Sequence, residues 1–286
     1  MERRRLGRTG HESTIAILGG AAFGRSNPEE TAAAFTSAVV DHGVNHLDIA
    51  PQYGLAQELV GPNIPAVRDR LFVGCKTLRK NVDGVKAQAE DSLQKLQIDS
   101  FDLYQAHAVT SLDVLEERMG ALAEIVRMRD EGLTRFAGIT GHDLTVPSTF
   151  LEALRRFDLD TVMFPVNARL WADPDYRRDA EQLLAVCAER DLGVMAIKAG
   201  AARPWGDRDK WATSWYEPRT DIEVGVRFTL SVSGVHAFAT PGDVAVTAQA
   251  IDAAESFTPM SADGMLEAMD AVRDEPHIFP IALHAR

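Results

Sequence analysis

The chain has 286 residues, enough for one large α/β domain, and its 45% hydrophobic and 25% charged residues are ordinary for a globular protein. Its formal net charge of -12 argues against nucleic acid and anionic membranes as partners, because both require a basic surface. The only two cysteines, Cys75 and Cys187, exclude a disulfide framework, and no run of about 18 apolar residues predicts a membrane span. We therefore expect a soluble, cytoplasmic protein.

The first part of the chain predicts a hairpin, a strand and a helix. Residues 3–6 and the glycine-containing turn at 7–10 form one arm of the hairpin, and a strand follows at 13–18. Asn27 and Pro28 begin a helix that ends at Gly43, since asparagine is a good N-cap and proline is favoured at the first helical position. A short strand follows at 46–48.

Strands and helices then alternate to the end of the chain. Short apolar runs predict strands at 71–76, 101–107, 135–140, 161–166, 194–198 and 235–240. Amphipathic runs predict helices at 85–96, 112–131, 147–157, 176–191, 221–232 and 244–257, and a short extra helix at 261–272. Eight short strands, each followed by a helix, predict parallel pairing and a single (β/α)8 barrel domain that covers 1–286.

An open doubly wound sheet is the alternative fold. Such a sheet usually has a glycine-rich phosphate-binding turn after its first strand. The glycines at positions 19, 20 and 24 lack the G-x-G-x-x-G spacing of that turn, so the sequence favours the barrel.

Polar residues end several predicted strands, at the edge of a barrel where active sites lie. Asp48 ends the second strand with Tyr53 five residues further on, Lys76 ends the third strand, and His107 ends the fourth. Taken singly, each is as easily a boundary or packing residue, but together they have complementary roles. Asp48 can keep Lys76 charged, and the ammonium can lower the pKa of Tyr53. The Tyr53 hydroxyl can then protonate a developing alkoxide while His107 hydrogen-bonds the carbonyl oxygen. This chemistry needs a hydride from a bound cofactor and no metal.

At these residues the chain resembles the aldo-keto reductases, which are NAD(P)H-dependent carbonyl reductases built on a (β/α)8 barrel. The segments that carry the likeness are 4–10, 48–54, 76–77, 103–107 and 135–140. The resemblance implies reduction of a small aldehyde or ketone, or oxidation of an alcohol. It makes Tyr53 the general acid/base, and the other three strand-end residues complete a catalytic tetrad.

The residues expected to bind the nicotinamide depart from the family pattern. Thr140 is in place to bind the carboxamide, but Gly141 stands where the family usually has asparagine. Met163 occupies the place of the usual glutamine, with Asn167 a few residues on. Lys198 replaces the aromatic residue that commonly stacks on the nicotinamide ring.

The phosphate groups of the cofactor have a second set of expected ligands. Lys198 and Arg203 are expected at the pyrophosphate, and Gly242 belongs to a turn at a helix N-terminus, which favours phosphate. Asp243 beside it would repel a 2′-phosphate and instead accept from a ribose hydroxyl, or simply begin the helix. The resemblance therefore favours NADP(H), whereas the local charge favours NAD(H).

Two other functions stay open from the sequence. A metal-dependent barrel lyase or hydrolase would use His46, Asp48, His107 and His142 as ligands. A nucleotide-binding regulatory module would keep the tetrad but turn over little substrate. Aromatic residues predicted to lie on loops at the mouth are expected to wall a pocket for an apolar carbonyl compound: Trp171, Trp205, Trp211, Trp215 and Tyr216.

Overall fold

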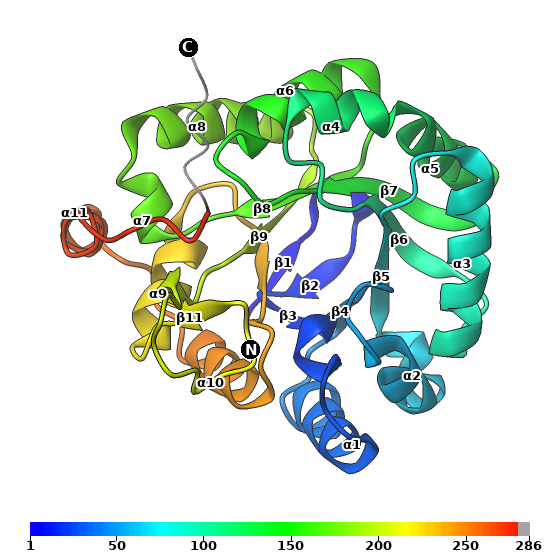
Figure 1. Cartoon of the computed structure of the whole chain (residues 1–286), viewed down its shortest axis with the longest axis horizontal. Coiled ribbons are helices and arrows are strands. Elements are labelled where there is room, and N and C mark those ends of the chain that lie inside the picture. The colour runs from blue at the N-terminus through cyan, green and yellow to red at the C-terminus, as the bar shows by residue number, and fades with distance from the viewer. Residues whose placement is uncertain (280–286) are drawn as a thin grey trace.

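The computed structural model describes residues 1–279, and its central feature is a closed barrel of eight parallel strands surrounded by helices (Figure 1). Around the barrel the strands follow the order β12-β3-β4-β5-β6-β7-β8-β9, and each neighbouring pair is parallel. This confirms the predicted (β/α)8 fold. The barrel strands are β3 (Ala16–Gly19), β4 (His46–Asp48), β5 (Phe72–Thr77), β6 (Phe101–Ala106), β7 (Thr134–Thr140), β8 (Thr161–Pro165), β9 (Gly193–Ile197) and β12 (Ala237–Ala239).

The helices on the outside follow the predicted pattern, with two short additional helices, Ala56–Val60 and Ala168–Trp171, and with changes to two predicted helices. The predicted helix at 112–131 is broken at Arg118 into α4 and α5, and the first helix continues into a π-helical turn, Ser37–Asp41. In the described residues no helix has both the length and the apolar character needed to cross a bilayer. The helices are α1 (Pro28–Thr36), α2 (Ala56–Val60), α3 (Val82–Leu96), α4 (Leu112–Glu117), α5 (Met119–Asp130), α6 (Val146–Arg156), α7 (Ala168–Trp171), α8 (Pro174–Glu189), α9 (Ile222–Ser231), α10 (Val244–Glu255) and α11 (Ala262–Asp270).

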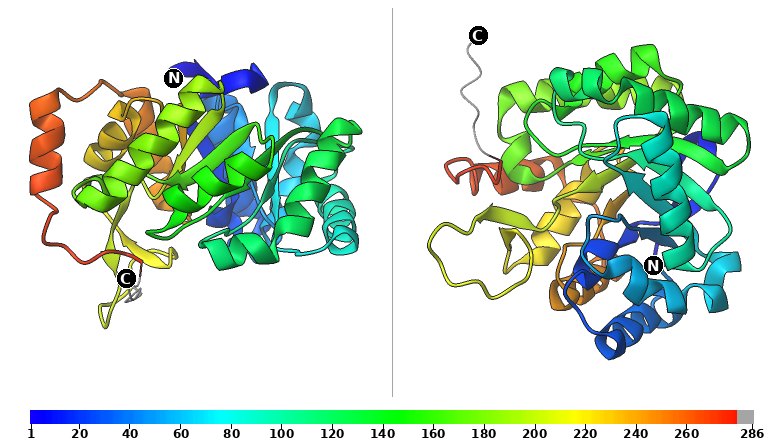
Figure 2. Two further views of the ribbon diagram at one scale, coloured as in Figure 1. Left: turned by 90° about the horizontal axis from the view of Figure 1, so that it is seen from above. Right: turned by 45° about the vertical axis from the view of Figure 1, so that its right-hand side comes forward.

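Two antiparallel hairpins lie at opposite ends of the barrel (Figure 2). The predicted N-terminal hairpin pairs β1 (Arg3–Arg5) with β2 (Glu12–Thr14). Leu6, just after β1, belongs to the core inside the barrel, so this hairpin closes the barrel's N-terminal end. The second hairpin pairs β10 (Ala201–Pro204) with β11 (Tyr216–Pro218). It was not predicted, because the sequence there has the polar, tryptophan-rich composition of a loop.

The barrel interior is apolar towards the N-terminal ends of the strands and polar near their C-terminal ends. Alternate residues of a strand point to opposite faces, so residues two apart point inward together. Asp48, Lys76, Gln105 and His107 are buried at the polar end. The apolar residues clustered inside the barrel are Leu6, Ile17, Phe72, Leu103, Met163, Met195, Ala237 and Ala239. This packed layer supports the polar residues from below.

Candidate active site

Lys76 is the centre of a hydrogen-bonded chain at the mouth of the barrel. Its ammonium donates to Asp48 Oδ2 at 2.5 Å and to the Tyr53 hydroxyl at 3.2 Å. Gln105, which the sequence reading did not single out, donates from Nε2 to Asp48 Oδ1 at 3.3 Å. Lys76 and Asp48 are only 1% and 3% exposed, so water does not screen this pair. The four residues therefore form one hydrogen-bonded unit, in which Tyr53 has the only hydroxyl.

A glycine turn fixes the position of Tyr53. Gly54 has φ +58°, and a Cβ placed on it would lie 2.3 Å from the carbonyl oxygen of Gly24. Leu55 N donates to that same oxygen at 3.2 Å, which ties the loop after β4 to the loop after β3. Only glycine combines this left-handed conformation with such a close backbone approach. The turn therefore holds Tyr53 above Lys76.

His107 stands beside Tyr53 and directly follows β6, the strand next to β5. The two rings meet edge to face with centroids 5.8 Å apart, and His107 Nδ1 lies 3.1 Å from Gln52 Oε1. Arg118, at which the outer helix is broken, donates to the carbonyl oxygen of His107 at 2.9 Å. With Gln52 Oε1 facing it, Nδ1 of the neutral ring carries the proton and donates. If the Gln52 amide is turned over so that its nitrogen faces the ring, Nδ1 accepts and Nε2 carries the proton as a donor.

Burial sets the protonation states of these groups. Burial, and then the charge of Lys76, hold the pKa of His107 well below its usual value, so the ring is neutral at neutral pH. Burial opposes the charge on Lys76, but Asp48 and Tyr53 outweigh it and raise the pKa of the ammonium. The sequence predicted that Lys76 lowers the pKa of Tyr53, but the pKa is raised overall. Burial raises the pKa of Tyr53 more than Lys76 lowers it, and the hydroxyl stays protonated.

A cavity of about 580 Å³ opens directly above Tyr53 and His107. That volume is typical of small-molecule sites. Its charged lining residues are Arg25, Asp48 and Lys198. Asp48, the one carboxylate of the described chain among them, is already paired with Lys76, so the cavity favours an anionic ligand.

Two of the residues expected to bind phosphate line this cavity, and two do not. Lys198 and Gly242 are on its wall. Arg203 instead bonds to Glu217 at 2.9 Å across the β10–β11 hairpin. Asp243 caps α10 by accepting from Val246 N at 3.0 Å, and its other oxygen accepts from the amide of Thr213 at 2.8 Å. The wall of the cavity therefore has fewer cofactor ligands than the sequence predicted.

The residues expected at the nicotinamide are largely engaged inside the protein. Thr140 is buried at the end of β7. Asn167 caps α7 by accepting from Leu170 N at 3.0 Å and donates to the carbonyl oxygen of Lys198 at 3.2 Å. A Cβ on Gly141 would lie 2.4 Å from a backbone oxygen, so the fold leaves no room there for the family's asparagine.

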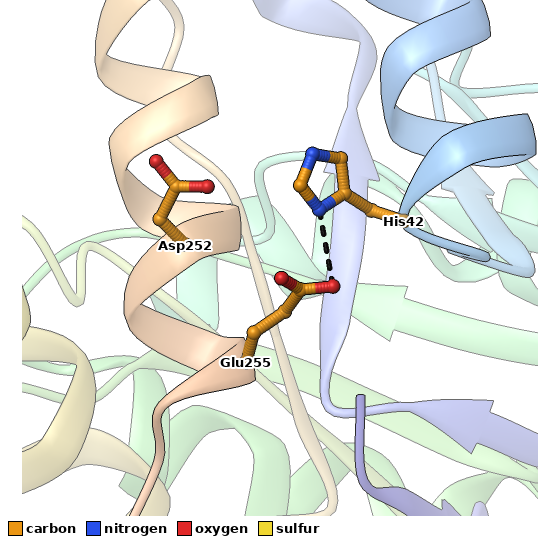
Figure 3. A group of neighbouring side chains, drawn as sticks. All are labelled: His42, Asp252 and Glu255. Atoms are coloured by element: carbon orange, nitrogen blue, oxygen red, sulfur yellow. Dashed lines mark ion pairs between the residues drawn. The ribbon is translucent and has the colours of Figure 1, made fainter.

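One side-chain trio of the described chain has the spacing of a metal site, and it lies outside the barrel. His42 follows the π-helical turn and faces Asp252 and Glu255 on α10 (Figure 3). His42 Nδ1 lies 3.0 Å from Glu255 Oε1, an ordinary surface ion pair when the ring is protonated. The trio includes none of the ligands that a metal-dependent barrel enzyme would need at the mouth, namely His46, Asp48, His107 and His142.

Known proteins resemble this chain in sequence and in fold. The family model described as Aldo/keto reductase family matches residues 16–212. The aldo-keto reductase YhdN of Bacillus subtilis is 30% identical over 185 residues, which are 58% of this chain and 54% of that protein. The L-galactose dehydrogenase of Arabidopsis thaliana is 29% identical over 181 residues, 57% of this chain and 56% of that protein. The chain thus spans somewhat more than half the length of these relatives.

Solved structures extend the likeness over almost the whole chain. The aldo-keto reductase AKR11C1 from Bacillus halodurans superposes with a TM-score of 0.72 at 19% identity and covers 97% of this chain and 98% of its own. An aldo-keto reductase from Klebsiella pneumoniae, solved in complex with NADPH, gives a TM-score of 0.70 at 19% identity and covers 97% of each chain. At 19% identity, the structural similarity shows the fold. The match to the family model shows the family. This chain therefore belongs to the aldo-keto reductase family.

Proposed function

We propose that this protein is an NAD(P)H-dependent oxidoreductase that interconverts a small aldehyde or ketone and its alcohol. The observation that carries the proposal is the buried chain from Asp48 through Lys76 to the Tyr53 hydroxyl, which ends beside His107 in the cavity. This arrangement can hold a carbonyl oxygen and deliver one proton to it. A bound NAD(P)H would supply the hydride.

Each residue of the tetrad has a separate task in the reduction. Tyr53 gives its proton to the carbonyl oxygen as the carbonyl carbon receives the hydride, so the product is a neutral alcohol. Lys76 stabilises the phenolate that remains on Tyr53, and Asp48 keeps Lys76 charged. The His107 ring donates to the same oxygen and orients the carbonyl group of the substrate. In the reverse reaction Tyr53 takes the alcohol proton.

The cavity fits an anionic dinucleotide in charge. Arg25 and Lys198 are on its wall, and the turn that contains Gly242 offers backbone amides at the end of β12. The carboxylate of Asp243 is occupied by its contacts with Thr213 and Val246, so it is not free to hold a ribose hydroxyl. This removes the ribose contact as a reason for choosing NAD(H), while the negative charge of Asp243 stays. We propose NADP(H), with which the Klebsiella pneumoniae relative was solved.

Cofactor binding and proton donation are tested with one variant. NADPH and NADH are titrated against the wild-type protein and Tyr53→Phe by fluorescence quenching, and aldehyde reduction is then measured with the preferred cofactor. We expect tighter binding of NADPH, similar cofactor affinity in both proteins, and a loss of roughly 10²–10⁴-fold in kcat for the variant, the usual contribution of a positioned acid. Equal turnover by Tyr53→Phe would show that another group donates the proton.

A second function is favoured by the altered nicotinamide site. Gly141 has no space for a side chain, and Met163 cannot hydrogen-bond a carboxamide as glutamine would. A protein with this site could bind the cofactor and act as a nucleotide-dependent regulatory module. Its signature would be tight binding of NADPH with negligible turnover of every aldehyde and ketone tried.

A further inference from the structure

Lys198 is held in an unusual backbone conformation at the end of β9. Its φ is +69°, in the left-handed region that residues other than glycine seldom occupy. The side chain of Asn167 donates to its carbonyl oxygen at 3.2 Å and helps to fix this turn. Strained backbone of this kind is concentrated at functional sites, where it aims a side chain that the site requires.

The Lys198 ammonium lies on two aromatic faces and has no carboxylate partner. Its Nζ is 4.9 Å from the centroid of Trp215 and 5.0 Å from that of Tyr216. No acidic side chain within residues 1–279 reaches ion-pairing distance of it. Burial, and then the charge of Lys76, lower the pKa of Lys198 to about 8. A half-buried cation without a counterion is the complement of an anionic ligand.

Lys198 lines the same cavity as Tyr53 and His107. Trp215 and His142 also line this cavity, and the centroids of their rings are 6.5 Å apart. Burial lowers the pKa of His142 and of His107, and the charge of Lys198 lowers both further. The charge of Lys198 therefore acts on the same space as the proposed proton donor.

We propose that Lys198 binds an acidic group of the substrate, so that the preferred substrates are carbonyl compounds that carry a carboxylate. The inference rests on the proposed function and names the substrate class of that same cavity. The carboxylate would pair with Lys198 while the carbonyl oxygen meets Tyr53 and His107, and the rings of Trp215 and Tyr216 would flank the carbon skeleton. The sequence had suggested the pyrophosphate as the partner of Lys198, and the experiment separates the two assignments.

The test compares two aldehydes of the same shape that differ in charge. 4-Carboxybenzaldehyde and 4-nitrobenzaldehyde are each reduced with NADPH by the wild type, Lys198→Met, Lys198→Arg and Lys210→Met. Lys210 is an exposed lysine of the loop between β10 and β11 and is absent from the cavity wall, so its variant is the matched control. We expect the ratio of kcat/KM for the acid to that for the nitro compound to fall at least tenfold in Lys198→Met, mainly through KM. Lys198→Arg should restore most of the ratio, and Lys210→Met should keep it.

Two results would overturn the proposal. An unchanged ratio in Lys198→Met would show that the lysine does not touch the acidic group. A parallel loss for both aldehydes, together with weaker NADPH binding by fluorescence, would assign Lys198 to the cofactor.

A binding measurement covers the case in which neither aldehyde is reduced. Benzoate and benzamide are then titrated against the NADPH-saturated proteins by calorimetry. Benzoate binding that is lost in Lys198→Met supports the carboxylate site even though the proposed reduction has failed. Absence of benzoate binding to the wild type overturns the site as well.

Discussion

At the scale of single residues, the tetrad depends on the balance between burial and charge. Lys76 and Asp48 are almost fully buried, and neither would be tolerated there without the other. The ammonium works against the burial that raises the pKa of Tyr53 and does not overcome it. In the protein alone Tyr53 is therefore protonated, which is the state that the proposed carbonyl reduction requires.

The coupling between Lys76 and Asp48 can be measured as stability. Lys76→Met leaves a buried carboxylate without its partner and should lower the free energy of unfolding by about 3–5 kcal/mol. The double variant Asp48→Asn/Lys76→Met removes both charges and should lose less than the sum of the two single variants. Urea unfolding of the four proteins gives this coupling. Additive losses would mean that the pair is not coupled in the folded protein.

The pKa of Lys198, lowered to about 8, predicts a pH dependence for anion binding. The lysine is charged below this pH and neutral above it, so the affinity for benzoate or an acidic substrate should fall as the pH rises from 7 to 9.5. Lys198→Arg should bind with little change over the same range, because arginine stays protonated. Calorimetric dissociation constants across this range test the prediction. An affinity that is flat in the wild type would contradict it.

At the scale of elements, the connections at the mouth decide what the cavity can bind. The β10–β11 hairpin presents Trp215 and Tyr216 to Lys198, and Trp205 Nε1 donates to Ser214 O at 2.8 Å to hold its long loop. The amide of Thr213 ties the same loop to Asp243 at the start of α10. These contacts make the loop a fixed wall of the site.

The turn after β7 shows how an element restricts chemistry. Restoring the family's asparagine by Gly141→Asn should destabilise the fold by about 1–3 kcal/mol and should not strengthen cofactor binding, because the new Cβ would collide with Val109 O. Gly242→Ala is the control, since its Cβ would find its nearest neighbour at 3.4 Å, an ordinary contact. Urea unfolding compares the two. A stable Gly141→Asn with tighter NADPH binding would show that the turn can rearrange.

At the scale of the whole molecule, the net charge of -12 and the charge of the mouth have opposite signs. The negative net charge argues against nucleic acid and anionic membranes as partners, yet the wall of the cavity carries Arg25 and Lys198. Within the described residues, the one carboxylate on this wall is that of Asp48, and it is paired with Lys76. A net charge averages over the surface, whereas a ligand responds to the groups around it. The barrel makes this separation possible, because it gathers residues from many strand ends at one place.

The sequence by itself determined the barrel and predicted that the residues of the proposed tetrad lie together. Strand and helix periods are local patterns, and parallel strands always present their C-terminal ends at one edge, so Asp48, Lys76 and His107 had to meet. The start of the first helix was also local, as Asn27 accepts from Glu30 N at 2.9 Å. The resemblance to the family added the proposed role of Tyr53 as the general acid/base.

Only the tertiary structure decided how the cavity is walled and charged. Several contacts join residues that no periodic pattern in the sequence connects. They are the β10–β11 pairing, the hydrogen bond from Arg118 to His107 and the close approach of Gly141 to Val109. The direction of the Tyr53 pKa shift and the lack of an acidic partner for Lys198 within the described residues depend on burial and on which carboxylates lie nearby. Burial and the distances between charged groups are set by tertiary packing. For this reason the sequence predicted that a cofactor-dependent site exists, and the fold decided which of its expected ligands face it.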